Sequence, residues 1–384
     1  MIPENSKVRK SILCGIAALV VITACVDVRY LAGQGGASFA FISADDGKVY
    51  ADAGPGRLVA VDGKAGSVLW DFRSENLSVL TTAAFRPNAL FVAGLGSDSN
   101  SELIRLNLAS GKADWHAPIA EPGGNASPVL CGEEVLVGDW WHGGVYAYSA
   151  ATGRSDWNTH SLPFMFIFPP AVVDSTGFFL VFDKKEPESI QRLIAVSCGN
   201  GQPHSALPVQ VDGASRTPVL RWGNSLILSG YDRLIGTSLK AIRIQDGVQL
   251  WSASVPDDIC RYTPVIQDDL FVAGAGSLWV VDLRTGKTVF SDALPIPSVP
   301  VAVANDLVFF SRGSRTVEAR ELPSGRLRWR AKLKGGISSN IAVTDGRVYV
   351  KIGDHELAKL RLTGEIDSYV DLEKPGSSAS GVLH

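Results

Sequence analysis

The histidines and paired carboxylates of the chain are the residues that could bind a metal ion or transfer protons. The six histidines lack the short spacings typical of ligands to one metal ion. We expect these residues to lie in solvated loops: His116, His142, His160, His204, His355 and His384. Three aspartate pairs flank expected strands, where turn formation accounts for them without catalysis: Asp45-Asp46, Asp257-Asp258 and Asp268-Asp269. The sequence thus predicts no catalytic residue, no metal and no cofactor.

The five cysteines contain no CxxC pair and no adjacent pair. Cys14 and Cys25 belong to the N-terminal segment, which leaves three in the body of the chain. Cys131, Cys198 and Cys260 each lie in or beside an apolar, strand-like run. We therefore interpret each of these three as a small buried hydrophobic residue.

Two apolar segments are the candidates for contact with a partner. Trp140 and Trp141 stand in a short connection, where packing inside the loop is the alternative interpretation. The second segment, residues 162–168, is expected to connect two structural units and is longer than that connection needs. Its bulky members are Leu162, Phe164, Met165, Phe166, Ile167 and Phe168. They are predicted either to be buried or to anchor a protein or lipid partner.

These segments interrupt a pattern that repeats eight times. A glycine preceded by a small or polar residue recurs every 39 to 48 residues. The glycines are Gly66, Gly111, Gly153, Gly201, Gly247, Gly286, Gly325 and Gly364. Four residues after six of them stands a large aromatic residue: Trp70, Trp115, Trp157, Trp251, Phe290 and Trp329. Ser205 and Ser368 occupy the other two positions, and a small residue usually lies six before the glycine.

Each repeat predicts four short β-strands, with the glycine supplying a positive φ in a hairpin turn. Four strands every 40–45 residues or so, with one aromatic per unit, are typical of a β-propeller blade. The aromatic is predicted to wedge between neighbouring blades and to dock over the small residue. We therefore predict an all-β, eight-bladed propeller over residues 37–372, followed by a flexible tail at 373–384.

Two segments could supply the outermost strand of the last blade. One is Val28–Leu31 near the N-terminus, where Tyr30 could serve as the docking aromatic; the other is Ile366–Leu372. We favour the C-terminal segment because Gly364 and Ala358 keep the spacing of the repeat.

Residues 1–24 are interpreted as a targeting segment. A basic flank precedes an apolar stretch of about 14 residues, shorter than the roughly 20 that a spanning helix needs. Ile22-Thr23-Ala24-Cys25 resembles the lipobox of bacterial lipoproteins, which implies that Cys25 carries lipid and that residues 25–36 form a short tether. Val26 is not the aspartate of lipoproteins kept in the inner membrane, so the resemblance implies the periplasmic face of the outer membrane. An uncleaved signal anchor and a later start site are the alternatives.

The repeat resembles the pyrroloquinoline-quinone-type propeller family, whose pattern is small-x-Asp-x-x-Thr-Gly-x-x-x-Trp. Within that class, the eight repeats, the length and the lipobox resemble the BamB family, lipoproteins of the outer-membrane β-barrel assembly machine. The resemblance covers roughly residues 30–372. It implies a non-enzymatic scaffold that binds a protein partner in the envelope.

The loops that would bind the machine's barrel subunit differ from the family pattern. The loop over residues 160–170 is apolar but lacks the family's arginine, and Ser215 and Arg216 stand where its acidic pair would lie. A quinone-dependent dehydrogenase of the same repeat class would need an adjacent cysteine pair, which is absent. A ligand-binding or sensing propeller is the alternative hypothesis.

Composition supports a folded chain that does not bind nucleic acid. The chain has 384 residues, of which 46% are hydrophobic and 20% charged, so disorder over most of its length is excluded. A net charge of −3 without a long basic run gives no electrostatic basis for DNA or RNA binding.

Overall fold

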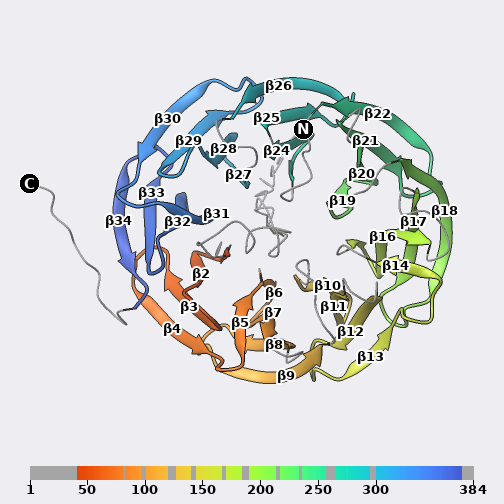
Figure 1. Cartoon of the computed structure of the whole chain (residues 1–384), viewed down its shortest axis with the longest axis horizontal. Coiled ribbons are helices and arrows are strands. Elements are labelled where there is room, and N and C mark those ends of the chain that lie inside the picture. The colour runs from red at the N-terminus through yellow and green to blue at the C-terminus, as the bar shows by residue number, and fades with distance from the viewer. Residues whose placement is uncertain are drawn as a thin grey trace, which may run out of the picture.

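The protein is a closed ring of eight blades, each built from consecutive strands (Figure 1). The structure is a computed structural model. It describes residues 41–81, 83–96, 101–119, 127–139, 144–166, 170–183, 190–212, 217–232, 236–256, 264–274, 276–294 and 300–373. The first strand of each blade, which is interrupted into two segments in blades 2 and 4, lies nearest the axis, and the last forms the outer rim. This architecture confirms the predicted eight-bladed propeller.

The first four blades have the following strands. Blade 1 contains β1 (Ile42–Asp45), β2 (Lys48–Asp52), β3 (Arg57–Asp62) and β4 (Val68–Arg73). Blade 2 contains β5 (Leu77–Leu80), β6 (Ala84–Arg86), β7 (Ala89–Gly96), β8 (Ser101–Asn107) and β9 (Ala113–Ile119). Blade 3 contains β10 (Val129–Cys131), β11 (Glu134–Asp139), β12 (Gly144–Ser149) and β13 (Ser155–Asn158). Blade 4 contains β14 (Phe164–Phe166), β15 (Ala171–Val173), β16 (Thr176–Asp183), β17 (Ile190–Ser197) and β18 (Pro203–Asp212).

The other four blades complete the ring. Blade 5 contains β19 (Leu220–Trp222), β20 (Ser225–Asp232), β21 (Gly236–Arg243) and β22 (Gln249–Val255). Blade 6 contains β23 (Val265–Gln267), β24 (Leu270–Gly274), β25 (Ser277–Asp282) and β26 (Lys287–Ala293). Blade 7 contains β27 (Val301–Ala304), β28 (Leu307–Ser311), β29 (Thr316–Glu321) and β30 (Leu327–Lys332). Blade 8 contains β31 (Ile337–Thr344), β32 (Arg347–Ile352), β33 (Glu356–Arg361) and β34 (Ile366–Asp371).

Burial within a blade explains the sequence pattern of its strands. The middle strands pack against both neighbouring blades, so β3 buries Leu58 through Val61 without alternation. The outer strand β4 has only its inner face covered and alternates between buried and exposed residues. The buried apolar residues form eight clusters, one at each interface between neighbouring blades. The core is therefore a ring of interfaces, and each blade depends on its neighbours for burial.

All eight repeat glycines adopt a positive φ, between 68° and 94°, in the turn between the third and fourth strands. Six of these glycines, all except Gly66 and Gly247, also receive the aromatic residue of the preceding blade. A Cβ atom on Gly111 would lie 2.5 Å from Trp70, and one on Gly325 would lie 2.2 Å from Phe290. Glycine is thus required twice, once by the backbone and once by the close approach of a ring.

Five of the repeat tryptophans donate an indole N–H hydrogen bond to the next blade. The bonds are Trp70 to Leu108 O (2.9 Å), Trp115 to Ala150 O (3.4 Å), Trp157 to Cys198 O (2.7 Å), Trp251 to Leu283 O (2.5 Å) and Trp329 to Leu362 O (2.6 Å). The small residue lies directly opposite the aromatic on the neighbouring strand of the same blade, as Ala60 does opposite Trp70. The aromatic therefore covers the small residue with one side and meets the next blade's glycine turn with the other.

The seam between blade 8 and blade 1 lacks this aromatic. β34 pairs with β33, as the favoured C-terminal assignment predicts, and Val28–Leu31 lies outside the described residues. The turn before β34 is one residue shorter than that of blade 2, since Gly364 N–H donates to Arg361 O three residues back. Tyr369, not Ser368, consequently lies opposite Ala358, and it packs toward blade 7.

Side-chain hydrogen bonds close the seam instead. The hydroxyl of Tyr349, in β32, donates to Gly63 O at 2.7 Å. Gly63 lies three residues before the repeat glycine of its blade, and in four other blades the carbonyl at this position accepts the indole N–H. Asn340 accepts from Ile42 N–H and donates to Ile42 O, both at 2.9 Å. Arg57 donates to Leu372 O at 2.7 Å. Among residues 41–373, as far as the structure describes them, the ring thus closes without a sheet that combines strands from its two ends.

No helix in the part of the chain that the structure describes is long and apolar enough to cross a membrane.

Candidate functional site

The connections of the propeller divide between two faces. The tight turns between the first and second and between the third and fourth strands lie on one face, here called the turn face. The links between blades and between the second and third strands lie on the other, here called the loop face, because successive strands of a blade run antiparallel. Both candidate segments from the sequence belong to loop-face connections of blades 3 and 4.

The two segments start from one corner of the ring. Trp140 and Trp141 lie outside the described residues, in the connection between the paired strand ends Asp139 and Gly144. His160, two residues before the second segment, lies so near Gly144 that a Cβ on this glycine would be 2.6 Å from the histidine ring. The roots of the two segments are therefore adjacent.

His160 is half-buried and its ring centroid lies 4.8 Å from that of Tyr146. The expectation of a solvated loop histidine is thus wrong at this position, because the residues that lead into the segment pack back on β12. Thr159 beside it is fully buried, accepts from Val145 N–H with its hydroxyl at 2.9 Å and donates its own N–H to Val145 O at 3.0 Å. These bonds fix where the segment leaves blade 3.

The sequence suggests that the second segment connects two blades, but part of it is a strand of blade 4. Leu162 is partly buried against the cluster between blades 3 and 4. Phe164, Met165 and Phe166 form β14, which pairs with the end of β16 and, with β15, makes an interrupted innermost strand. The expectation of a connection is wrong here because β16 is eight residues long. It has room to pair with β14 as well as with β15. Ile167 and Phe168 lie outside the described residues.

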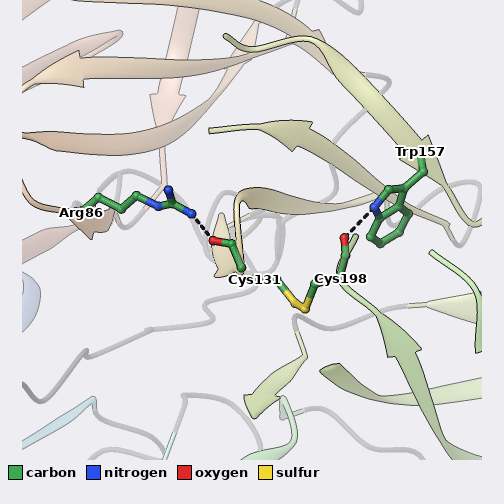
Figure 2. The surroundings of a disulfide bond; sticks show 5 residues. Arg86, Cys131, Trp157 and Cys198 are labelled. Atoms are coloured by element: carbon green, nitrogen blue, oxygen red, sulfur yellow. Dashed lines mark hydrogen bonds between the residues drawn. A yellow bond between two sulfur atoms is a disulfide. The ribbon is translucent and has the colours of Figure 1, made fainter. Parts of the chain in front are cut away.

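A disulfide joins blades 3 and 4 on the turn face (Figure 2). Cys131 and Cys198 are 67 residues apart in sequence and 5.4 Å apart between their Cα atoms. Both are buried, as predicted, but the expectation of free hydrophobic residues is wrong, because the end of β10 and the residue after β17 meet at this interface. Arg86 donates to Gly132 O and pairs with Glu133, so blade 2 joins the same junction.

Ionisable groups are buried at the loop-face end of the seam. Asp52 is 8% exposed and Lys351 is 4% exposed, with Arg57 close by. Burial raises the pKa of Asp52 to about 6, although an N–H bond from Gly54 and the charge of Lys351 oppose the shift. Burial also lowers the pKa of Lys351. The pair makes the stability of the seam sensitive to pH.

The remaining ionisable candidates have structural surroundings. His116 pairs with Glu102 at 2.9 Å and is about half exposed. Asp46 and Asp268 adopt positive φ in turns, which accords with turn formation. Among the described residues, no group of three histidine, cysteine, aspartate or glutamate side chains is placed to hold a metal ion.

The eight blades, their glycine turns and their tryptophan wedges define a propeller of the pyrroloquinoline-quinone repeat class. The chain matches the family described as outer membrane protein assembly factor BamB over residues 29–166 and 274–377. These segments make up more than half of the sequence, and the chain belongs to this family. No curated protein matches it at a significant level.

Solved structures with similar folds include both a family member and enzymes. BamB from Moraxella catarrhalis is 16% identical, with a TM-score of 0.61, over 82% of this chain and 93% of that one. Quinohemoprotein alcohol dehydrogenase from Comamonas testosteroni is 13% identical, with a TM-score of 0.60, over 81% of this chain and 70% of that one. Dihydro-heme d1 dehydrogenase NirN is 14% identical, with a TM-score of 0.65, over 90% of this chain and 76% of that one. At these identities the likeness concerns the fold alone.

Proposed function

We propose that the protein is a non-enzymatic scaffold of the cell envelope that assists the assembly of outer-membrane proteins. The observation that carries this proposal is the match to the BamB family over more than half of the chain. A ring with stable interfaces and many loops on one face suits a binding platform. Its partner in this proposal is the β-barrel assembly machine.

The binding surface in this proposal is the loop-face corner of blades 3 and 4. Two apolar segments leave the ring there from adjacent roots, at Gly144 and His160. The disulfide joins the same two blades on the opposite face and limits their relative movement. A linked pair of blades with two apolar segments starting at one corner is the proposed basis of the protein interface.

Photo-crosslinking tests this surface. A photoreactive amino acid replaces Pro163, which is exposed on the loop face, and in a matched protein it replaces Thr152, exposed on the turn face of blade 3. In cells we expect position 163 to crosslink to the barrel subunit of the machine and position 152 to give no such product. Crosslinking from position 152 alone, or no product containing the barrel subunit, would contradict the proposed surface.

We further propose that Cys25 is acylated and holds the propeller at the periplasmic face of the outer membrane. The lipobox-like Ile22-Thr23-Ala24-Cys25 supports this placement. Labelled palmitate should enter the wild-type protein, whereas Cys25→Ala should accumulate as an unlabelled precursor. Equal labelling of the two proteins would refute acylation at this residue.

The alternatives are a ligand-binding or sensing propeller and, with less support, a quinoprotein dehydrogenase. The dehydrogenases of similar fold keep the second alternative open to experiment. Titration of the purified chain with pyrroloquinoline quinone and calcium, followed by absorbance, separates the cases. Saturable, tight binding would contradict the non-enzymatic proposal.

A further inference from the structure

Blade 7 carries a charge that differs from the rest of the molecule. Residues 301–334 contain eight lysines and arginines and three acidic residues, a net charge of +5 in a chain whose total is −3. The remainder of the sequence therefore has a net charge of −8. So large a local excess needs a cause specific to this blade.

The excess is concentrated on the outermost strand of the blade. β30 has the sequence LRWRAK, and with its flanks it places a basic residue at every second position: Arg326, Arg328, Arg330, Lys332 and Lys334. Alternate residues of a strand point to the same side, as Arg330 and Lys332 do. A bulge opposite Ala319 and Arg320 interrupts this alternation at Leu327 and Arg328. The five side chains, here called the basic ladder, therefore form a row that is broken at this bulge. At about 3.4 Å per residue the row is on the order of 25 Å long.

Packing leaves the basic ladder accessible to solvent. The intervening residues Trp329, Ala331 and Leu333 face blade 8 and take up the buried side of the strand. The side chains of Arg326 and Arg328 are 70% and 54% exposed, and that of Lys334 is 50% exposed. The ladder therefore lies on the outer wall of the ring (Figure 1).

Acidic neighbours neutralise only part of this charge. Glu321 pairs with Arg326 at 2.6 Å and with Arg328 at 3.1 Å. The fully buried Glu318 pairs with Arg330 and Arg320, both at 2.6 Å. Lys334 pairs with Glu356 of blade 8, also at 2.6 Å. Three carboxylates thus serve four guanidinium groups and one ammonium group, so a smaller positive excess remains.

Protection of a free sheet edge does not explain the ladder. Charged side chains on an edge strand do prevent pairing with other chains. However, each of the other seven outer strands has at most one lysine or arginine within its bounds, although all present the same kind of edge. The cluster of basic residues is therefore specific to the outer strand of blade 7.

Exposed aliphatic residues lie on the outer strands beside the ladder, as they also do in blades 1 and 5, where Leu69 is 44% exposed and Leu250 is 41% exposed. Val289 in β26 is 45% exposed, Leu327 in β30 is 42% exposed and Ile366 in β34 is 38% exposed. Lysines and arginines interspersed with exposed aliphatic side chains are typical of surfaces that lie in a membrane interface. A protein hot spot would instead centre on exposed aromatic residues, and Trp329 is turned into the interface with blade 8.

We propose that the outer wall of blade 7 is a contact surface for a bilayer rich in anionic phospholipid, with the basic ladder on the headgroups and the flanking aliphatics at their margin. Residues 26–41 can span at most about 53 Å at 3.3 Å per residue, so an anchor at Cys25 permits this orientation. The contact itself does not require the anchor, since the charges attract the surface directly.

Fluorescence quenching in vesicles tests the contact on the full chain. An environment-sensitive fluorescent amino acid replaces Leu327 and, in a matched protein, Ser155, which is exposed on β13 at the opposite wall of the ring (Figure 1). The vesicles contain a lipid-borne quencher in phosphatidylcholine alone or mixed with phosphatidylglycerol. We expect quenching at position 327 in the anionic vesicles at low salt, its loss in molar salt or neutral vesicles, and no quenching at position 155.

A triple substitution tests the ladder without disturbing the buried Glu318. Arg326→Gln, Arg328→Gln and Lys332→Gln remove three charges, each worth about fivefold in affinity for an anionic surface, so the contact should weaken on the order of a hundredfold. The matched control removes the same charge from blades 1 to 3, with Arg73→Gln, Lys112→Gln and Arg154→Gln, and should leave quenching unchanged. Absent quenching at position 327, as an acidic protein partner would give, equal quenching in neutral vesicles, or equal loss in both triple variants would overturn the proposal.

Discussion

The hydroxyl group of Tyr349 is predicted to stabilise the seam between the ends of the chain. The side chain is fully buried, and its hydroxyl donates to Gly63 O at 2.7 Å. Tyr349→Phe keeps the ring and its packing, so no cavity forms. It leaves a buried carbonyl group without its donor, which costs about 1–3 kcal/mol of unfolding free energy.

The expected change in melting temperature follows from the size of the ring. The strands extend over residues 42–371. At roughly 2.1 cal/mol/K per residue, the unfolding entropy of such a ring is about 0.7 kcal/mol/K. The loss of 1–3 kcal/mol therefore lowers Tm by about 1.5–4 °C. Calorimetry measures this shift directly.

Tyr148→Phe is the matched control, because the hydroxyl of Tyr148 donates to Pro118 O at 2.8 Å across the interface of blades 3 and 2. Both variants should lose similar stability. Hydrogen exchange should accelerate at blades 8 and 1 in Tyr349→Phe and at blades 2 and 3 in Tyr148→Phe. An unchanged Tm, or the same exchange pattern in both variants, would refute the role given to Tyr349 at the seam.

Removal of the last outer strand, of the disulfide or of one buried charge should each alter stability in its own way. Ending the chain after Thr363 removes β34 and the buried Val370 and Leu372, worth about 1.5–3 kcal/mol each, so circular dichroism should show a far lower melting temperature or no soluble protein. Replacing Cys131 and Cys198 together by alanine opens a loop of 67 residues and should reduce the unfolding free energy by about 4 kcal/mol in urea titrations. Asp52→Asn should stabilise the protein near pH 7.5 and change it little near pH 4, as thermal melts at the two pH values would show.

The direction of shift of the Asp52 pKa sets the sign of this last effect. The folded-state pKa, about 6, lies above the ordinary value of 3.8, so the folded protein holds the proton more tightly. The stabilising contribution is complete below pH 3.8 and is lost as the pH rises through the folded pKa. The loss amounts to about 3 kcal/mol, and the amide side chain of the Asp52→Asn variant avoids it by remaining neutral. A variant that is equally stabilised at both pH values would contradict this explanation.

The other two predictions have equally clear failures. A protein that ends after Thr363 yet melts like the full chain would show that another segment closes blade 8. A double alanine variant with unchanged stability would show that the disulfide between blades 3 and 4 contributes nothing to the cooperative unit.

The repeat pattern predicted the ring because three side-chain requirements recur at fixed spacing. The positive φ at Gly66 and its counterparts is a local requirement, and so are the small residue and the aromatic that face each other across one hairpin. Local requirements appear in the sequence as residue types at fixed, short spacings. The number of blades follows from counting these spacings, and the pairing of β34 follows from the last of them.

The features that the sequence did not predict depend on contacts between distant residues. Cys131 and Cys198 meet only because two blades close against each other, and an odd number of cysteines without characteristic spacing gives no signal for the pair. β14 is a strand because β16 extends far enough to pair with it. Tyr349 replaces the missing wedge from a different strand, so a search at the fixed spacing of the aromatic could not find it.

Because the seam joins blades 8 and 1 by side-chain contacts, the same ring could form from a chain that starts at a different blade. In a propeller whose last sheet combines strands from both termini, that sheet is made from two separate stretches of sequence. Here every sheet is one continuous stretch of sequence. A circular permutant that joins the present ends by a linker and opens the chain between any two other blades would keep all eight sheets whole. In evolution, by the same logic, duplication or loss of a single gene segment would add or remove one complete blade.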